Sequence, residues 1–553
     1  MGWGKFNGSN KFPNPLKYIS DGFTSRPSRS DNYSRGGTPS FDKWFRGDIG
    51  IFGGFEYSFT KIRGLSMKME YDPFDYSDFS AQNRDDASYF LRKKDSNVNL
   101  GLNYPLNDYL QINASYIKGN TFNLSFTIGA TFDEKLRTKP KFNPTIRIKK
   151  DSNKSELAFY EDLLFNLNNN NLLLQTASIS QKKLNISIST SQHRNSIRSA
   201  YYAATVAKNI SQEYPVKLNQ INISHLNTGI ELNNITFVAS HLDNKETPIE
   251  IIERYTKLDS GNMNSYKSHK FKPNVKFPVL FTSFSPAVVS YLGNPEKFYF
   301  GGLDITNASE IQFNRNTLLS SQINYSLYNN FKDTTYQPDS NMEHVRTDKV
   351  LYLQNVDLYI KRLQLDYIWS PKKNLYAKLS GGIFEDMFGG IGGQLLFKPF
   401  DSNLNVSIEG FYVKQRDYDQ KLKFRDYQTT TAHINIGYLL PLGIESNISF
   451  GRYLAKDDGY TFDLSRRTKS GFRAGIYFTR TNVSAELFGE GSFDKGFYFQ
   501  VPMDLFSKNY SGNYSNFKLS PLTRDGGAKL EFDKDLKGLI YNSSLNELSR
   551  GWN

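Results

Sequence analysis

The sequence predicts a protein dominated by antiparallel β-strands, with a module of mixed helices and strands between two β regions. Apolar and polar residues alternate with a period of two up to about residue 133 and again from about residue 275 to the C-terminus. A helical period occurs only between these two regions. The alternation predicts strands with one apolar and one polar face, and the intervening change of period predicts a separate module.

The composition of the 553-residue chain narrows the class of protein. Only 38% of the residues are hydrophobic, and no apolar run approaches the roughly 20 residues of a spanning helix. The absence of cysteine excludes disulfides, thiolate metal sites and cysteine nucleophiles. A net charge of +13 favours anionic partners such as nucleic acid, acidic glycans or lipid head groups. The first residues, MGWGKFNGSN, lack the pattern of an export signal and, taken alone, predict a cytoplasmic protein.

In the first β region, the segment GLSMKMEYD (64–72) places Leu, Met, Met and Tyr on one face and Ser, Lys, Glu and Asp on the other. Segments 97–104, 110–116 and 122–129 repeat this pattern, with a short turn at 105–108. In the second region, about a dozen such segments follow, among them 319–327, 363–369 and 404–410. Such strands, with aromatic residues near their ends, are typical of outer-membrane β-barrels. A soluble sandwich or barrel with one solvated face would show the same alternation.

The intervening module is predicted from helical spacing. Leu157, Tyr160, Leu164 and Leu167 recur at this spacing after a possible cap at Ser155, and an alanine-rich stretch does so after 194–196. Strand-like runs at 184–188 and 221–223 alternate with these helices. We therefore expect an α/β module between residues 138 and 275, entered through a lysine-rich segment at 139–150.

Few residues carry a recognisable chemistry. The six histidines show no metal-ligand spacing, and only His344 has an acid, Asp348, three or four residues away. We predict neither a metal site nor a cofactor. The carboxylate pairs Glu385 with Asp386 and Asp417 with Asp419 could serve a glycosidase, but each also fits a charged loop or rim of a barrel. The charged, tyrosine-rich stretch YVKQRDYDQKLKFRDY (412–427) predicts a long hairpin with hydrogen-bonding groups suited to a hydroxyl-rich ligand.

Several motifs resemble the YjbH-type exopolysaccharide proteins. In the second half they are HVRTDKVLY, LSGGIFEDMFGGIGGQLLFKPF, VKQRDYDQ, FRDYQTTTAH, GRYLAKDDG, FGEGSFDKG and PLTRDGGA, and in the first half FRGDIGIFGGFEY, LSMKMEYD and IKGNTFNLSFTIG. They follow one another in family order over nearly the whole chain. The resemblance implies a non-enzymatic outer-membrane protein of Gram-negative bacteria that serves exopolysaccharide or capsule export. It also implies two barrels in one chain and a periplasmic portion.

With this resemblance, the predicted fold is two antiparallel transmembrane β-barrels separated by a small periplasmic α/β module. The domains are an incomplete barrel portion at 1–137, the module at 138–275, and a second barrel with a C-terminal tail at 276–553. The first barrel is expected to be incomplete because its region offers only about five or six strands, whereas small closed barrels need about eight. Family members also carry a signal peptide and a further stretch before the Gly-Trp-Gly segment that here follows Met1.

The predicted function is a passive conduit or guide for the exported polymer. Two alternatives remain open: a glycan-modifying enzyme of the outer membrane, and a non-conducting anchor for periplasmic assembly partners. Expected partners are an exopolysaccharide or capsular glycan, outer-membrane lipid, and periplasmic and lipoprotein components of the same export system, but no nucleic acid. Residues predicted to contact the polysaccharide are Glu385, Asp386, Glu409, Arg416, Asp417, Tyr418, Asp419, Arg425, Asp426, Tyr427, Glu486, Glu490 and Asp494.

Overall fold

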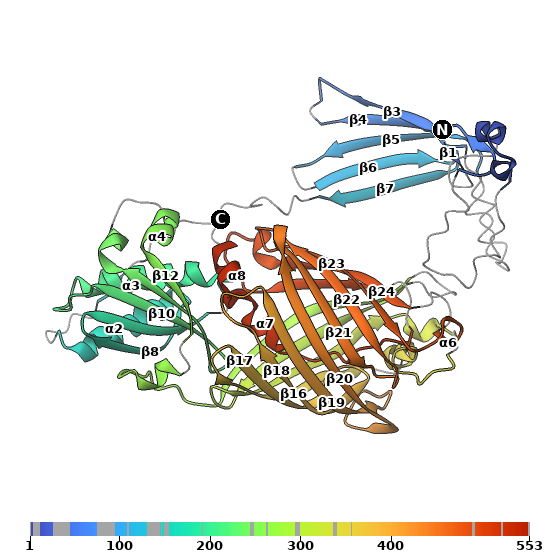
Figure 1. Ribbon diagram of the computed structural model, residues 1–553. Helices are drawn as coiled ribbons and strands as arrows, with labels where there is room; N and C mark the ends of the chain where they lie inside the picture. Colours follow the sequence, from blue (N-terminus) through green and yellow to red (C-terminus); the bar gives the residue numbers. More distant parts are fainter. Residues whose placement is uncertain are drawn as a thin grey trace. The chain divides into compact units, whose positions relative to one another are not determined.

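The computed structural model describes most of the chain (Figure 1). The described residues are 2–3, 12–25, 45–62, 64–73, 94–107, 110–129, 144, 146–148, 154–190, 192–243, 248–261, 264–292, 299–335, 340–354, 357–488, 493–520 and 524–550. The chain forms two compact units, Met1–Thr131 and Phe132–Asn553, which are described separately. No helix in these residues is long and apolar enough to cross a lipid bilayer.

The first unit contains a five-stranded antiparallel sheet. Its strands, in spatial order, are β3 (Gly53–Ser58), β4 (Ser66–Tyr71), β5 (Val98–Pro105), β6 (Leu110–Ile117) and β7 (Thr121–Ile128). The register aligns apolar residues in rows: Tyr57 pairs with Met67, Met67 with Leu102, and Leu102 with Ala114. Tyr57 is 54% exposed and Leu124 54% exposed, so the apolar face of this sheet is uncovered within its own unit.

The second unit begins with the α/β module. Its sheet has the order β12 (Thr256–Ser260), β11 (Ile230–Val238), β10 (Gln220–Asn227), β9 (Lys183–Ser189) and β8 (Leu173–Ser180), with β9 and β10 parallel. Helices α2 (Glu156–Asn169) and α3 (Ser196–Ser211) cover the sheet, and α4 (Pro248–Tyr255) follows β11.

Both predicted helix starts are confirmed. Ser155 caps α2 through Ala158 N, and Asn195 caps α3 through Arg198 N. The predicted buried face of α2 is wrong at Leu157, which is 59% exposed, because the helix turns Phe159 and Leu163 towards the core instead.

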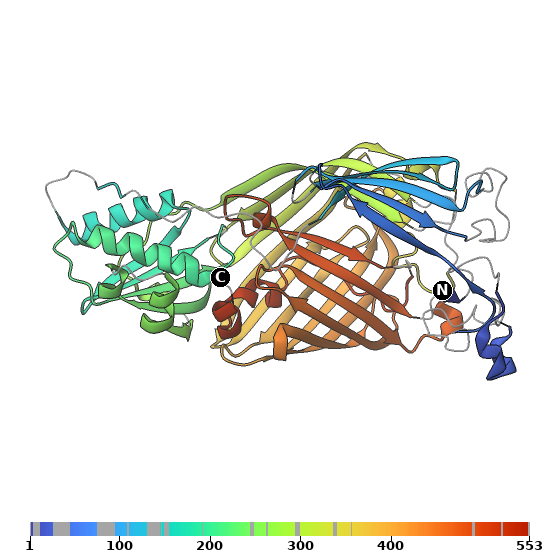
Figure 2. The same ribbon diagram turned by 90° about the horizontal axis from the view of Figure 1, so that it is seen from above.

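The rest of the second unit is a 13-stranded antiparallel sheet in which every strand pairs with the next one in the chain. The strands are β13 (Val279–Leu292), β14 (Tyr299–Gln312), β15 (Thr317–Asn329), β16 (Leu358–Lys372), β17 (Leu375–Ile383), β18 (Phe388–Phe397), β19 (Leu404–Arg416), β20 (Phe424–Leu440), β21 (Ile444–Arg452), β22 (Asp458–Arg467), β23 (Arg473–Thr481), β24 (Asp494–Pro502) and β25 (Tyr514–Leu519). Strands β13 and β25 are its two edges. Figure 2 shows the sheet curling around an interior.

The two faces of this sheet have inverted polarity. The face that we call inner carries buried polar side chains, among them Asp304, Gln364, Lys378, Gln394, Glu409, His433 and Glu445. The outer face carries exposed apolar side chains: Leu365 is 45%, Leu379 57% and Ile408 53% exposed. These assignments confirm the faces predicted from the alternation at 363–369 and 404–410. A soluble sheet would do the opposite, with its apolar face in the core.

A pair of glycines on β17 and β18 allows close packing against the strands on either side, β16 and β19. Gly382 has a φ of +126°, and a Cβ added there would lie 2.2 Å from the Leu363 carbonyl oxygen. A Cβ at Gly390 would lie 2.1 Å from the carbonyl oxygen of Tyr412. Any larger residue at these two positions would push neighbouring strands apart.

The C-terminal residues 524–548, which we call the inner segment, run through the interior, and Leu548 near their end packs in the module core. This segment includes α7 (Leu536–Ile540) and the first residues of α8 (Leu545–Arg550). At one end, Ala528 and Leu530 pack with Tyr352, Phe384 and Phe411. At the other, Leu536 and Ile540 pack with Ile368 and Leu396, and with Ile230 of the module.

The two ends of the sheet differ. Short turns such as 313–316 and 441–443 lie at the module end, where Arg315 Nη2 donates to the Gln175 carbonyl at 3.4 Å and Arg194 pairs with Asp504 at 2.6 Å. The opposite end carries the long connection between β15 and β16, which contains α5 (Lys349–Gln354), and the hairpins 384–387 and 417–423.

Candidate functional site

The carboxylate of Asp525 helps to fasten the inner segment at the long-loop end. Asp525 Oδ1 accepts hydrogen bonds from three successive backbone amides, Val345 N at 2.9 Å, Arg346 N at 2.8 Å and Thr347 N at 2.9 Å. Its other oxygen accepts from the hydroxyls of Ser340 and Thr347. Because consecutive amides form a site for an anion, this arrangement ties the inner segment to the long connection.

Next to this contact, two hairpins are held by arginines. Arg346 forms a two-pronged ion pair with Glu385, at 2.9 and 3.1 Å, and also donates to the Lys529 carbonyl. Burial raises the pKa of the Glu385 carboxyl to about 7, although the Arg346 guanidinium opposes this shift. Arg416 is fully buried and donates to four main-chain carbonyls, those of Glu385, Asp386, Gln420 and Lys421.

Beside these hairpins, the structure brings several predicted residues together around one open cavity of about 500 Å³. We call it the mouth cavity. Its walls carry the predicted Asp417, Arg425, Asp426 and Tyr427, and also Met342, Glu343, His344, Asp348, Gln415 and Phe424. Carboxylates, a guanidinium and flat aromatic rings thus share one space, which gives the mouth cavity both hydrogen-bonding groups and apolar ring faces.

Hydrogen bonds order the charged wall of the mouth cavity. Tyr418 donates to Asp348 at 2.6 Å, and Arg425 Nη1 donates to the Tyr418 hydroxyl at 2.6 Å with its guanidinium 4.4 Å from the ring centre. Burial and the Asp348 hydrogen bond raise the pKa of Tyr418 to about 12. Burial lowers the pKa of His344, but the Ser340 carbonyl and the Asp348 carboxylate outweigh this effect and hold it above its usual value.

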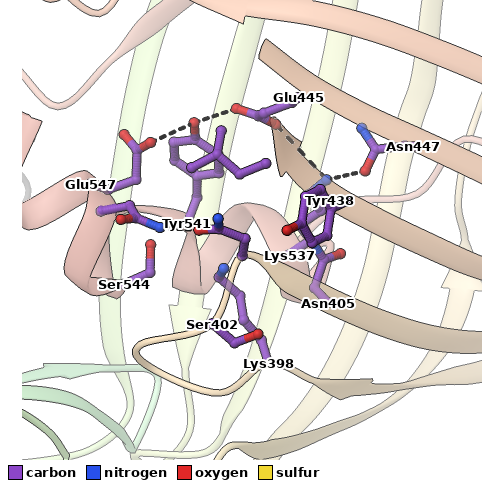
Figure 3. A pocket seen from close by; sticks show the side chains of 13 residues that line it. Lys398, Ser402, Asn405, Tyr438, Glu445, Asn447, Lys537, Tyr541, Ser544 and Glu547 are labelled. Carbon is purple, nitrogen blue, oxygen red and sulfur yellow. Dashed lines mark hydrogen bonds and ion pairs between the residues drawn. The ribbon is translucent and has the colours of Figure 1, made fainter. Parts of the chain in front are cut away.

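At the module end, the inner segment is latched to the wall around Glu445 (Figure 3). Tyr541 donates to Glu445 and, at 3.0 Å, to Glu547, and Lys537 pairs with both Asn447 and Glu445. The lining also includes Lys398, Ser402, Asn405, Tyr438 and Ser544. This pocket has a volume of about 30 Å³, which is too small for a sugar ring. Its polar groups therefore hold the inner segment to the wall.

The remaining predicted contact residues are scattered. Glu409 lies on the inner face and pairs with Lys529 of the inner segment at 2.8 Å. Asp419 accepts from Lys421 N within its own hairpin. Glu486 is exposed on α6 (Ala485–Phe488), and Asp494 begins β24; neither lines the mouth cavity. Glu490 lies outside the described residues.

Sequence reasoning missed several residues that shape this region. The spacing of His344 and Asp348 was noted only for metal binding, yet their 2.7 Å contact helps to order the mouth cavity. Asp525 stands in the motif PLTRDGGA, but nothing local in the sequence indicates its amide partners. The loss of alternation after Leu519 and the helical spacing of Leu536 and Ile540 were available signals for a segment outside the sheet.

The module also contains a buried chain of hydrogen bonds in the order of a hydrolase triad. Ser199 Oγ lies 2.7 Å from His225 Nε2, and His225 Nδ1 lies 2.8 Å from Asn233 Oδ1. Ser199 has no exposed surface, and Asn233 has none either. Since a nucleophile must reach its substrate, we assign these residues to the packing of α3 on the sheet.

The comparison with known proteins agrees with the motifs. Residues 1–541 match the family described as "Exopolysaccharide biosynthesis protein YbjH". The chain belongs to this YjbH family. It is 29% identical over 572 residues to a family relative from Escherichia coli K12, "Uncharacterized lipoprotein YjbH", an alignment that covers 99% of the chain and 78% of the relative.

Solved outer-membrane proteins give only weak structural matches to this YjbH family member. OccK9 (OpdG) of Pseudomonas aeruginosa has a TM-score of 0.24 at 11% identity, covering 40% of this chain and 62% of that one, less than two thirds of its length. OmpF of Salmonella typhi, in a complex with daunomycin, has a TM-score of 0.24 at 11% identity, covering 46% and 95%. OmpT of Vibrio cholerae has a TM-score of 0.20 at 10% identity, covering 40% and 80%.

Proposed function

We propose that this protein is an outer-membrane component of exopolysaccharide export, in which the 13-stranded sheet forms a lipid-facing barrel and its interior guides the polymer. The inverted polarity of the sheet carries the proposal: Leu365, Leu379 and Ile408 are exposed, while the polar side chains beside them are buried. This arrangement is favourable when the outer face meets hydrocarbon. The family description and the name of the E. coli relative support an envelope role.

The proposal includes an orientation. Outer-membrane barrels have short turns on the periplasmic side and longer loops outside. The α/β module contacts short turns through Arg194, which donates to the Ser470 carbonyl, and through Arg315 of the turn 313–316. The long connection with α5 lies at the other end. By this rule the module lies in the periplasm and the mouth cavity opens to the exterior, where Asp417, Arg425, Asp426 and Tyr427 contact the emerging glycan.

The inner segment bears directly on the conduit function. Residues 524–548 bind the wall of β14, β17, β18 and β19, for instance through Lys534 to Glu310 at 2.6 Å and through Lys529 to Glu409 at 2.8 Å. Passage of a polymer through the centre therefore requires the segment to move. The filled interior also favours a second candidate function, in which the barrel stays closed and anchors the module for periplasmic partners. Neither candidate includes a chemical step.

A reversible cross-link separates these two candidates, and the cysteine-free chain suits it. The double variant Glu409→Cys/Lys529→Cys, treated with a short bis-methanethiosulfonate reagent, ties the inner segment to β19. The control Glu409→Cys/His433→Cys links two directly paired wall positions and leaves the segment free. A conduit predicts that only the first cross-link stops secretion of exopolysaccharide, and that a reductant restores it. Undiminished secretion with the segment tied would refute the conduit and leave the anchor.

A further inference from the structure

The inner segment does not fill the interior evenly. Between it and strands β13–β16 the structure contains an open cavity of about 280 Å³, near the lower end of the roughly 300–1,000 Å³ typical of small-ligand sites. We call it the wall cavity. Its lining consists of Phe281, Thr282, Ser283, Ala308, Ser309, Glu310, Ser320, Ser321, Gln322, Arg362 and Asp533.

The register shows which of these side chains share the inner face. Phe281 pairs with Glu310, and Glu310 pairs with Ser320, which is buried on the inner side. Two residues further along, Ser283 pairs with Ala308, and Ala308 pairs with Gln322. Successive pairs separated by two residues lie on the same face, so these two rows form one surface of small polar side chains with one aromatic ring.

Buried polar atoms on this surface lack partners within the described part of the chain. They are Ser320 Oγ, Thr306 Oγ1 and Asn324 Oδ1, on side chains whose residues are 7%, 5% and 1% exposed. Ser320 lines the wall cavity itself, and Thr306 pairs directly with Asn324 one row beyond Ser283. Since nearly all buried polar groups in folded proteins are hydrogen-bonded, one such atom in the wall cavity and two in the next row of the same face point to a hydrogen-bonding ligand.

The charges around the wall cavity select a neutral ligand. Glu310 is paired with Lys534 at 2.6 Å, and Asp533 lies 3.9 Å from Arg362. Each carboxylate therefore faces a cation, and the side chains left for a ligand are hydroxyls, amides and the half-exposed ring of Phe281. Hydroxyl arrays and weakly apolar ring faces are what a neutral sugar offers to such a surface.

We propose that the inner face of β13–β15 is a binding track for an uncharged stretch of the exported glycan, running between the wall and the inner segment once that segment has moved aside. This inference rests on the proposed export function and deepens it by naming the path. The unpartnered atoms lie on β14 and β15, between the pair Glu310–Ser320 and the pair Thr306–Asn324. These pairs are four residues apart along each strand, which corresponds to about 13 Å. The track is therefore long enough for more than one sugar ring.

Two neighbouring residues of β13 provide the test. Ser283 is exposed to the wall cavity, whereas Phe284 is 73% exposed on the outer face. In Ser283→Cys, we expect a membrane-impermeant methanethiosulfonate reagent to label the thiol at least fivefold more slowly in cells that produce the polymer than in cells that cannot synthesise it. The matched variant Phe284→Cys should show no such difference. Equal rates at Ser283→Cys, including no labelling in either strain, would overturn the track.

A blocking variant adds an independent result. Ser283→Trp fills the wall cavity and should reduce secreted exopolysaccharide severalfold, while Phe284→Trp, assembled equally well as judged by heat-modifiable gel migration, should secrete normally. If both variants secrete like the parent, the track is wrong. Failure of the export function itself would look different, because cells lacking the whole protein would then secrete normally.

Discussion

The guanidinium of Arg416 donates a hydrogen bond of 2.9 Å to the main-chain carbonyl of Glu385, thirty-one residues away in the chain. A second pair of donors reaches Gln420 and Lys421, so one buried side chain holds both hairpins beside the mouth cavity. The contact of Arg416 with a glycan stays a prediction, but the N–H groups of its guanidinium already donate to carbonyl groups of the protein. This observation decides which variants can test glycan binding without disturbing the fold.

We expect Arg416→Lys to lower the free energy of unfolding by about 3 kcal/mol, because an ammonium cannot reproduce two forks and leaves buried carbonyls without partners. The temperature at which the folded gel band converts to the unfolded band measures this change. Arg425→Lys, at a partly exposed pair with Asp348, should cost less than about 1 kcal/mol. Similar conversion temperatures for the two variants would contradict the structural role of Arg416.

The polarity of the sheet gives a second prediction. If the outer face meets lipid, Ile408→Lys should cost about 2 to 4 kcal/mol near the bilayer midplane. Ser283→Lys, on the inner face beside Glu310 and Asp533, should be tolerated. Folding yield into lipid vesicles compares the two. If both lysines are accepted equally, the faces do not differ in environment and the membrane assignment is wrong.

The sequence predicted the local features of this fold well, because period-two alternation reports directly which residues share a strand face. It identified the polar face within 363–369, the helix cap at Ser155 and the helix start near 194–196. Glu385 and Asp386 were also expected to fit a charged loop or rim, and they lie in the hairpin 384–387. Such patterns act over a few residues, and a single sequence displays them.

Long-range partners were not predictable in the same way. Asp525 accepts hydrogen bonds from amides 178 to 180 residues earlier in the chain. Leu548 packs in the core of the α/β module, although the whole 13-stranded sheet lies between the module and Leu548 in the sequence. From the sequence we expected only a C-terminal tail after the second barrel. The sequence predicted the hairpin residues that line the mouth cavity. It did not place Glu343 and Asp348 there, because they belong to the connection between β15 and β16, which the Asp525 contact holds in position.

Loss of the Asp525 contact should loosen the inner segment. Asp525→Ala removes a carboxylate that accepts from the Val345, Arg346 and Thr347 amides. It should destabilise this end by at least about 3 kcal/mol, since each hydrogen bond to a charged group contributes roughly 1.5 to 3 kcal/mol. In planar bilayers we expect larger or more frequent openings than for the parent protein. The control Asp533→Asn changes a partly exposed acid of the same segment. Unaltered conductance in Asp525→Ala would show that this contact does not keep the interior closed.

The module should lose stability in mild acid. Burial lowers the pKa of His225 to about 4 from an ordinary value of 6.5, so the folded state binds a proton less readily than the unfolded chain. The stabilisation is therefore complete above about pH 6.5 and is lost as the pH falls towards 4, by at most about 3 kcal/mol. Hydrogen exchange of β10 and β11 in the full-length protein should show this loss, and His225→Gln, which cannot titrate, should reduce the pH dependence. An identical pH dependence in the variant would place the effect elsewhere.

The last prediction concerns the mouth cavity as a glycan contact. Arg425 and Tyr427 are the predicted residues there that offer a guanidinium and an aromatic ring, and both are partly accessible, unlike Arg416. Because a sugar needs donors and a flat ring face together, Arg425→Ala/Tyr427→Ala should reduce secreted exopolysaccharide severalfold. The loss of one partly exposed pair and of the Tyr427 hydrogen bond to Leu454 should cost only about 1 to 2 kcal/mol of stability.

Two controls make this experiment specific. Glu486→Ala alters an exposed acid away from the cavity and should leave secretion unchanged. Tyr427→Phe removes the hydrogen bond to the Leu454 carbonyl but retains the ring, so it should behave like the parent if ring stacking is what the glycan requires. Normal secretion by the double variant, with intact assembly in gel migration, would remove the mouth cavity from the glycan path and leave the wall cavity as the only contact proposed within the barrel.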